Sequence, residues 1–283
     1  MTAAISVVVN TLDAERYLAY ALRSVASWTA EIVVIDMMST DRTVAIAREH
    51  GARVVFHPRA DCVEAARAFA VAQATRPWIL LLDADELVPM ALSRRLAAIV
   101  TADAVDVVRI PRLNYLLGAP VLHTGWNPDR DRHCRFFRPG SVVLPTRIHE
   151  PIHGAAGARL LELPYAPGEA LVHFNYTDVD DFVARLDRYT SVEADHAHAG
   201  GERASVGKAV GSAFREWLVR YGRHGGWRDG WRGVHLTLLM ACYRVIVQAK
   251  LASRQHLGPG ADVAREYVGE AERVLAEYDA PTR

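Results

Sequence analysis

Three acidic residues follow directly on an apolar run in the first third of the chain. Residues 78–86 read Trp-Ile-Leu-Leu-Leu-Asp-Ala-Asp-Glu, so Asp83, Asp85 and Glu86 come at the end of the run. Such a run is typical of a strand buried on both faces, and open α/β sheets place their ligands at the carboxyl ends of these strands. Two carboxylates separated only by Ala84 can hold a hard divalent cation that also takes oxygens from a diphosphate.

These acids also have a purely structural interpretation. Asp85 or Glu86 could cap a helix that begins near Pro89 and runs to Val100. An Asp-x-Asp motif alone is weak evidence of a metal site. Its position after a buried strand favours the functional interpretation, because acids without a role are found mostly on solvated faces.

The first hundred residues alternate between strand and helix patterns. We expect helices at 17–25, 42–50, 65–74 and 89–100, with Ser39, Thr40 or Asp41 able to cap the second, and strands at 5–9, 32–35, 53–56 and 78–82. This alternation predicts a parallel sheet of right-handed βαβ units. The polar residues that follow its strands are therefore expected at one edge of the sheet.

After Val105 the pattern changes to short strands and turns. We expect strands over 107–111, 121–126 and 135–137, with a hairpin turn over 117–120. From about Asp178 the chain is predicted to be helical, with Gly and Trp residues between 225 and 233 breaking two helices. The apolar face of residues 231–251 is expected either to pack on the core or to contact a bilayer or a second subunit. We therefore predict a domain over 1–177, with halves 1–103 and 104–177, and a helical extension over 178–283.

Composition excludes several classes of protein. The content of hydrophobic residues is 51%, enough for a substantial core, and basic and acidic residues number 33 each, so we expect no nucleic-acid partner. Cys62, Cys134 and Cys242 are few and far apart, which argues against a disulfide framework or a structural zinc site and fits a reducing cytosol. We expect neither a signal peptide nor a membrane span, since no stretch reaches about 18 uninterrupted apolar residues.

Four short motifs carry a resemblance to a known family. They are Thr11-Leu12-Asp13-Ala14-Glu15, Ile35-Asp36-Met37-Met38-Ser39-Thr40-Asp41, Ala66-Arg67-Ala68 and the nine residues from Trp78. Together they resemble the family 2 glycosyltransferases of GT-A fold, within them the lipopolysaccharide core and capsule type. Met37, Met38 and Ala68 depart from the family pattern, which leaves the preference for a nucleotide base open.

The resemblance implies a GT-A fold, an α/β structure with a mostly parallel, Rossmann-like sheet, and roles for particular residues. Arg67 would lie against ribose or diphosphate, where its planar donor fork suits phosphate oxygens. Asp36 and Arg67 also have structural explanations, as a helix cap and a solvated side chain. The residues implied to bind the nucleotide-sugar are Thr11, Asp13, Glu15, Asp36, Arg67, Asp83, Ala84 and Asp85, and those implied to bind the metal are Asp85 and His173.

The second half of the chain is expected to supply the general base. Arg147-Ile148-His149-Glu150 resembles an Arg-x-His-Glu element of the subfamily, which makes Glu150 the first candidate for the base and His149 the second. An ordinary ion pair with Arg147 is the structural alternative. Asp129 and Asp131 are reserve candidates.

The sequence thus predicts a cytoplasmic, metal-dependent, inverting glycosyltransferase. It would use Mg²⁺ or Mn²⁺ and move a sugar from a nucleotide-sugar, UDP-linked by default, to a saccharide, a lipid-linked saccharide or a small natural product, with peripheral contact to the inner face of the membrane. One alternative is a nucleotidyltransferase, although residues 10–16 lack the Gly-rich loop of such enzymes. The other is a catalytically inactive nucleotide-sugar-binding or scaffold protein.

Overall fold

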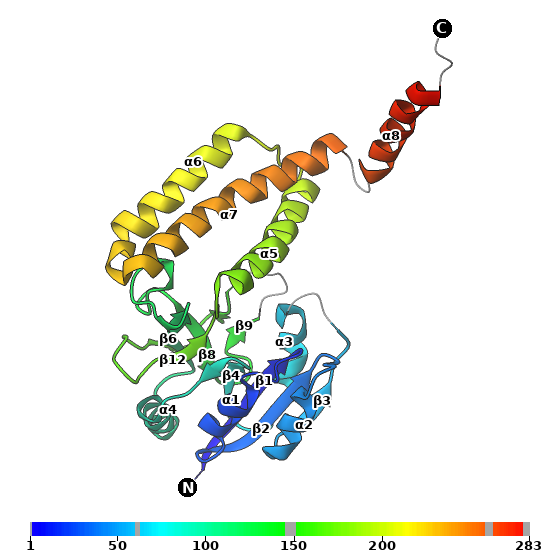
Figure 1. The fold of residues 1–283 in the computed structure, drawn as a ribbon. Coiled ribbons are helices and arrows are strands. Elements are labelled where there is room, and N and C mark those ends of the chain that lie inside the picture. The colour runs from blue at the N-terminus through cyan, green and yellow to red at the C-terminus, as the bar shows by residue number, and fades with distance from the viewer. Residues whose placement is uncertain (1, 60–62, 145–150, 258–262, 280–283) are drawn as a thin grey trace. The chain divides into compact units, whose positions relative to one another are not determined.

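The computed structural model describes residues 2–59, 63–144, 151–257 and 263–279 (Figure 1). The chain divides into two compact units. Unit 1 comprises Met1–Asp178 with Arg228–Gly233, and unit 2 comprises Val179–Trp227 with Val234–Arg283.

Unit 1 begins with four parallel strands and the helices that connect them. The strands are hydrogen-bonded in the order β3-β2-β1-β4. In chain order the elements are β1 (Ala3–Thr11), α1 (Leu18–Val25), β2 (Thr29–Asp36), α2 (Thr43–Glu49), β3 (Arg53–Phe56), α3 (Val63–Ala72) and β4 (Trp78–Asp83).

The sheet continues beyond β4 with strands of both directions. Strand β8 lies antiparallel between β4 and β6, and β12 pairs parallel with β6 and antiparallel with β5. The elements are β5 (Glu86–Leu87), α4 (Met90–Ala102), β6 (Val107–Leu116), β7 (Ala119–Pro120), the 3₁₀ helix η1 (Thr124–Trp126), β8 (Arg132–Phe137), β9 (Val142–Val143), β10 (His153–Gly154), β11 (Leu160–Glu162) and β12 (Leu171–Phe174).

The central strands are buried on both faces. Along β1, Val7 and Val9 join a cluster with residues of α1, α2 and α4, whereas Val8 joins a second cluster with residues of α3. Because successive side chains of a strand point to opposite faces, this alternation requires apolar residues throughout β1. The continuous run that predicted a buried strand therefore reflects cover by helices on both sides.

Unit 2 is helical. Helix α7 (Gly230–Leu257) belongs to unit 2 from Val234 onward. It makes ion pairs with two neighbouring helices: Lys250 with Asp187 of α5 at 2.7 Å, and Arg244 with Glu216 of α6 at 3.2 Å. The remaining elements are α5 (Val179–Ala199), α6 (Val206–Trp217), the π-helix η2 (Leu218–Arg223), the 3₁₀ helix η3 (Gly226–Asp229) and α8 (Val263–Asp279). Among the described residues one helical stretch, Gly226–Leu257, is long and apolar enough to cross a membrane by length and composition, which for a single helix is weak evidence.

The predicted fold class is confirmed: an α/β structure with a mostly parallel sheet, followed by a helical region. The hairpin over 117–120 is also confirmed, since β6 and β7 pair around Leu117 and Gly118. The predicted break between two helices lies in the first part of the Gly and Trp group over residues 225–233, because α7 already begins at Gly230. Cys134 and Cys242 are free, and Cys62 lies outside the described residues.

One predicted strand is wrong. Residues 121–126 form a loop that ends in η1 instead of a strand. The backbone N–H groups of Leu122 and His123 donate to the carboxylate of Asp229 at 3.2 and 2.9 Å, and His123 Nδ1 lies 2.9 Å from the same carboxylate. A side chain distant in sequence thus takes the hydrogen bonds that a neighbouring strand would need.

Candidate functional site

The carboxyl ends of β1, β2 and β4 lie next to one another. Thr11 is in register with Asp36 on β2, and Asn10 is in register with Asp83 on β4. The strand order reverses between β1 and β4, and open α/β sheets bind their ligands at such a switch point. The sheet topology therefore brings the polar residues predicted from three separate segments to a single edge.

The loops after β1 and β2 are joined by reciprocal hydrogen bonds. Asp13 accepts from the backbone N–H of Thr40 at 2.7 Å and donates its own N–H to Ser39 Oγ at 2.9 Å. Glu15 accepts from the N–H of Arg42 and donates its own to Asp41, both at 3.0 Å. The carboxylates of Asp13 and Glu15, although exposed, thus organise the loop before α2.

Asp36 is committed to the same structure. It is fully buried, and its two oxygens accept from Thr11 Oγ1 at 3.1 Å, Ser39 Oγ at 2.6 Å and the Ser39 N–H at 2.9 Å. Thr11 is buried as well. The buried side chains of Thr11 and Asp36 therefore hold the two loops together from within.

Asn10, at the end of β1, was not singled out in the sequence. Its side chain is 6% exposed, and neither atom of its amide has a hydrogen-bond partner among the described residues. Buried amides without partners are rare in folded proteins and call for a specific explanation.

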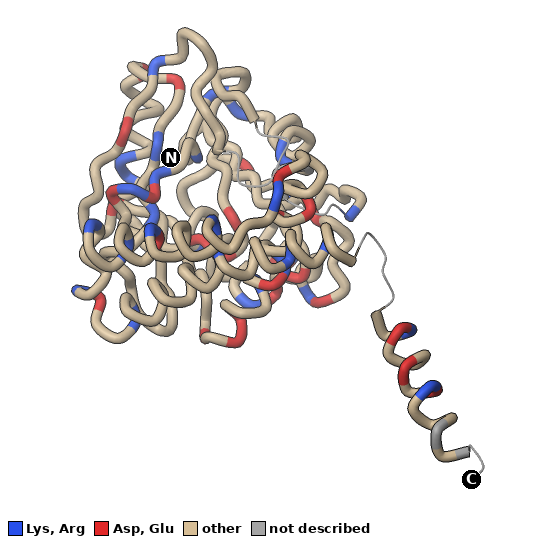
Figure 2. The backbone as a smooth tube through the Cα atoms, turned by 90° about the horizontal axis from the view of Figure 1, so that it is seen from above, with Lys and Arg blue, Asp and Glu red and all other residues tan. Residues whose placement is uncertain are grey.

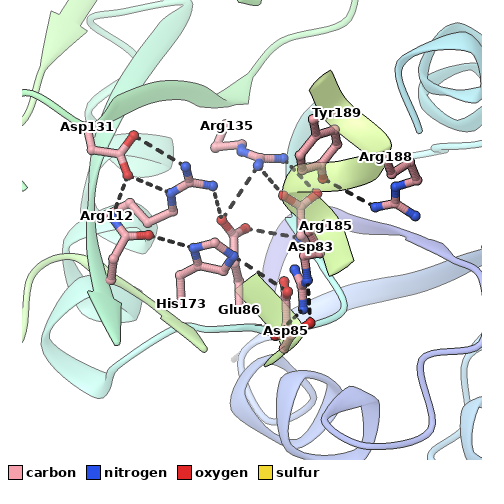
Figure 3. A network of polar contacts seen from close by, with 12 residues as sticks. Asp83, Asp85, Glu86, Arg112, Asp131, Arg135, His173, Arg185, Arg188 and Tyr189 are labelled. Carbon is pink, nitrogen blue, oxygen red and sulfur yellow. Dashed lines mark hydrogen bonds and ion pairs between the residues drawn. The ribbon is translucent and has the colours of Figure 1, made fainter. Parts of the chain in front are cut away.

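Asp83 is held by two arginines, of which Figure 3 labels Arg135. Arg135, on β8 and only 4% exposed, contacts both oxygens of Asp83, one of them at 3.0 Å, and Arg67 of α3 lies 3.8 Å away. Burial would raise the pKa of Asp83, but the charges of Arg135 and then Arg67 outweigh it and hold the pKa well below its usual range. Asp83 is therefore ionised, and Arg67, which the resemblance implied to lie against ribose or diphosphate, lies beside the acidic motif.

Glu86 lies next to Asp83 and is completely buried. Its carboxylate accepts from the Asp83 N–H at 3.0 Å and lies 3.5 Å from Arg135 and 3.4 Å from Arg112 of β6. A buried carboxylate needs such partners, since an isolated one is very costly in an apolar interior. Two acids, Asp83 and Glu86, and two arginines, Arg112 and Arg135, thus form one network of opposite charges.

Asp131 continues this network. It accepts from Arg112 Nε at 2.9 Å, Asn114 Nδ2 at 2.6 Å and His133 Nε2 at 2.7 Å. Burial would raise its pKa, but the His133 hydrogen bond and the Arg112 charge hold the pKa well below its usual range. A carboxylate held in this way is a poor proton acceptor, which removes Asp131 from the reserve candidates for the general base. Burial also lowers the pKa of His133, although its hydrogen bond to Asp131 acts in the opposite direction.

Asp85 meets His173 across the pairing of β5 with β12. The Phe174 N–H donates to the carbonyl of Asp85 at 3.0 Å, and His173 Nε2 lies 3.5 Å from Asp85 Oδ2 (Figure 3). The structure therefore places side by side the two residues that the resemblance implied as metal ligands. No group of three His, Cys, Asp or Glu residues that could hold a metal occurs within the described parts of the chain.

Asn114 determines which nitrogen of His173 carries the proton. The amide nitrogen of Asn114 donates to the carboxylate of Asp131, so its oxygen faces His173 Nδ1 at 2.7 Å. An amide oxygen can only accept, so His173 Nδ1 carries the hydrogen. In the neutral ring Nε2 is then left with its lone pair directed toward Asp85, which is the arrangement that metal-binding histidines adopt.

Several residues of this site were missed in the sequence. Arg112 and Asn114 on β6, and His133 and Arg135 on β8, are spaced two apart and so share a face of their strands. Polar residues at period two within apolar strands were the available signal. Ala84 is half-buried against the core, and the two candidates for the base, His149 and Glu150, lie outside the described residues.

Comparison with known proteins connects this site to a family. The family model described as Glycosyl transferase family 2 matches residues 6–159. The lipopolysaccharide core biosynthesis glycosyltransferase LpsC of Rhizobium meliloti is 28% identical over 266 residues, covering 89% of this chain and 93% of that protein. An uncharacterized glycosyltransferase of Rickettsia typhi is 31% identical over 210 residues, covering 71% of this chain and 70% of that protein.

Among solved structures, the glucosyl-3-phosphoglycerate synthase of Mycobacterium tuberculosis, in complex with Mn²⁺, uridine diphosphate and glucosyl-3-phosphoglycerate, is 24% identical with a TM-score of 0.34. The likeness covers 39% of this chain and 44% of that one, too little to carry a conclusion. The family match itself spans more than half of the sequence and includes β1, β4 and the acidic motif. The chain therefore belongs to the glycosyl transferase family 2 and is a glycosyltransferase.

Proposed function

We propose that this glycosyltransferase moves a sugar from a nucleotide-diphosphate sugar to an acceptor hydroxyl, with inversion at the sugar and with a divalent metal bound by Asp85 and His173. The observation that carries the proposal is the meeting of these two side chains at 3.5 Å, with His173 Nδ1 tied to Asn114. UDP is the default nucleotide, and Mg²⁺ and Mn²⁺ are both suitable cations.

The chemistry of the two side chains fits a cation. A carboxylate oxygen and an imidazole nitrogen are both common ligands of divalent cations, and because Nδ1 of His173 donates to Asn114, Nε2 is the nitrogen that a metal could take. The buried arginines compensate Asp83 and Glu86 but leave Asp85, whose side chain is 29% exposed, facing outward. When bound, the metal would neutralise charge on the departing diphosphate.

The other residues at this edge are proposed to bind the donor. Arg67 is suited to bind a phosphate oxygen, because it is one of the positive charges next to Asp83 and its planar guanidinium matches phosphate oxygens. We propose that the loops organised by Asp13, Glu15 and Asp36 contact the base and ribose. We propose that the bound donor also supplies the partners that the Asn10 amide lacks among the described residues.

The base and the acceptor are proposed from sequence and relatives. Glu150 is the proposed general base and His149 the second candidate. An inverting transfer needs such a group opposite the leaving diphosphate, and Asp131 is unsuited to the task. The similarity to a lipopolysaccharide core biosynthesis glycosyltransferase of Rhizobium supports a saccharide or lipid-linked saccharide as acceptor.

A thermal-shift screen tests the donor site. We expect one of UDP, GDP, ADP and dTDP to raise the melting temperature with Mn²⁺ or Mg²⁺ and not with a chelator, because a ligand of the native state stabilises it by mass action. Asp85→Asn and His173→Gln should each remove the metal-dependent part of the shift. Asp103→Asn, which changes an exposed acid at the end of α4, should retain it. If no nucleotide changes the melting temperature, the proposal fails.

Product analysis tests the stereochemistry and the base. Glu150→Gln should abolish transfer while leaving the nucleotide-dependent melting shift intact, because a general base acts on the acceptor and not on donor binding. The anomeric configuration of the product, measured by NMR, should be opposite to that of the donor. A product with retained configuration would exclude the inverting mechanism.

A further inference from the structure

Helix α6 and the π-helix η2 that follows it carry a row of apolar side chains in solvent. Val206, Val210, Phe214 and Leu218 are 81%, 63%, 61% and 51% exposed. Their spacing of four residues places them on one side of the helix. Figure 1 shows α6 alongside α7 within unit 2.

The side of α6 that packs within unit 2 is not the apolar one. Ala209 is its only residue in the buried class, and two polar contacts join α6 and its N-cap to α7. Glu216 accepts from Arg244 at 3.2 Å, and the N–H of Ser205, the N-cap of α6, donates to Gln248 at 3.2 Å. An amphipathic helix of a globular unit ordinarily turns its apolar side to the core. In α6 three large apolar side chains, Val206, Val210 and Phe214, are exposed instead.

Two half-buried aromatic rings, those of Trp217 and Tyr221, adjoin this exposed row at Phe214. Phe214 and Trp217 stack with ring centroids 6.0 Å apart, and Trp217 and Tyr221 stack at 5.4 Å. The three rings therefore run along the same side of the helix as the aliphatic residues. Trp and Tyr are the residues that prefer the boundary between an apolar phase and water.

The charge around the row is positive although the whole chain has no net charge. Residues 203–227 contain five basic residues and one acid, Glu216, which is paired with Arg220 and Arg244. Four of the basic residues are exposed, namely Arg203, Lys208, Arg215 and Arg223. An apolar row flanked by uncompensated cations is complementary to a surface that offers both hydrocarbon and negative charge.

Helix α8 provides a useful contrast. It also exposes apolar residues, among them Val268 and Leu275 at 57% and 62%. Residues 263–279, however, contain five acids and two basic residues, and Figure 2 shows both signs of charge interleaved along this helix. Its apolar side therefore lacks the positive surroundings of α6.

We propose that α6 and η2 form an interfacial segment that docks on an anionic lipid bilayer. Val206, Val210, Phe214 and Leu218 enter the boundary of the acyl chains. Trp217 and Tyr221 lie at the level of the headgroups, and Lys208 and Arg215 contact lipid phosphates. All residues of this surface belong to unit 2, whereas the residues proposed to bind the donor belong to unit 1.

Vesicle flotation of the full chain tests the proposal. The protein should float with vesicles that contain phosphatidylglycerol and should float at least tenfold less with vesicles of phosphatidylcholine alone. The double variant Val210→Ser/Phe214→Ser should lose binding to both kinds of vesicle. Its matched control, Val268→Ser/Leu275→Ser on α8, should bind like the unchanged protein. Lys208→Glu/Arg215→Glu should lose binding to the anionic vesicles, and added salt should weaken binding of the unchanged protein.

Several outcomes would overturn the proposal. Protein that stays at the bottom with anionic vesicles overturns the proposal, and so does equal binding by Val210→Ser/Phe214→Ser. Should sedimentation equilibrium show a dimer that this variant abolishes, while flotation is absent, the row is an interface between two copies of the chain. Because all changed side chains are exposed, the nucleotide-dependent melting shift should be unaltered in every variant, which separates this test from that of the donor site.

Discussion

Replacing Arg135 with Met should destabilise unit 1 far more than removing a cation from an exposed ion pair. Arg135 is 4% exposed and is shared by Asp83 and Glu86, the second of which is completely buried. In Arg135→Met the methionine fills much of the space, so that the main loss is the compensating charge. Two carboxylates that differ in exposure are then left with fewer partners.

The magnitude follows from what each acid retains. Breaking a buried ion pair costs about 3–5 kcal/mol. Asp83 keeps Arg67 at 3.8 Å and has a side chain that is 27% exposed, and Glu86 keeps Arg112 at 3.4 Å. We therefore take the lower limit, about 3 kcal/mol, which for a unit of this size lowers the melting temperature by about 6–12 °C. The pKa of Asp83 should rise toward its ordinary value.

Thermal unfolding followed by circular dichroism, with urea titration at neutral pH, measures this loss. The matched control is Arg109→Met on β6, which removes a pair with Glu162 whose members are 37% and 44% exposed. Exposed pairs contribute about 0–1 kcal/mol, so the control should change little. If the two variants lose equal stability, the buried network does not compensate the acidic motif as described.

Three further predictions concern the rest of the network and the loops. Because the pKa of Asp131 is lowered on folding, its contribution to stability is complete above the unfolded value of about 3.9 and is lost as the pH falls through the lower folded value. Urea titrations should show the free energy of unfolding falling below about pH 5, with a flatter acid limb in Asp131→Asn; unchanged slopes would contradict this. Asp36→Ala should cost about 2 kcal/mol, because it leaves two hydroxyls and an N–H without their acceptor, whereas Glu15→Ala should cost under about 0.5 kcal/mol. Asn114→Leu should weaken Mn²⁺ binding, measured by calorimetry, by about 10–100-fold, since His173 loses the partner that orients it; an unchanged affinity would count against the proposed metal site.

Local patterns in the sequence determined much of unit 1. The apolar run before Asp83 and the alternation of strands with helices depend on neighbours a few residues apart, so they predicted β1 to β4 and placed Asp36, Arg67 and Asp83 at one edge. The spacing of the acids around Ala84 also indicated the kind of ligand they could take. These properties are written in short segments and do not depend on the path of the rest of the chain.

Only the tertiary structure decided which distant side chains meet. The pairing of β5 with β12 brings Asp85 next to His173, and the pairing of β8 with β4 brings Arg135 next to Asp83. The burial of Asp36 and the outward-facing apolar row of α6 were equally invisible in sequence, because both depend on which surface of a segment another segment covers. Period and composition specify that a strand or a helix forms. Strand order, register and the choice of packed face arise from contacts between segments far apart in the chain, and these set the ionisation and orientation of the side chains in the site.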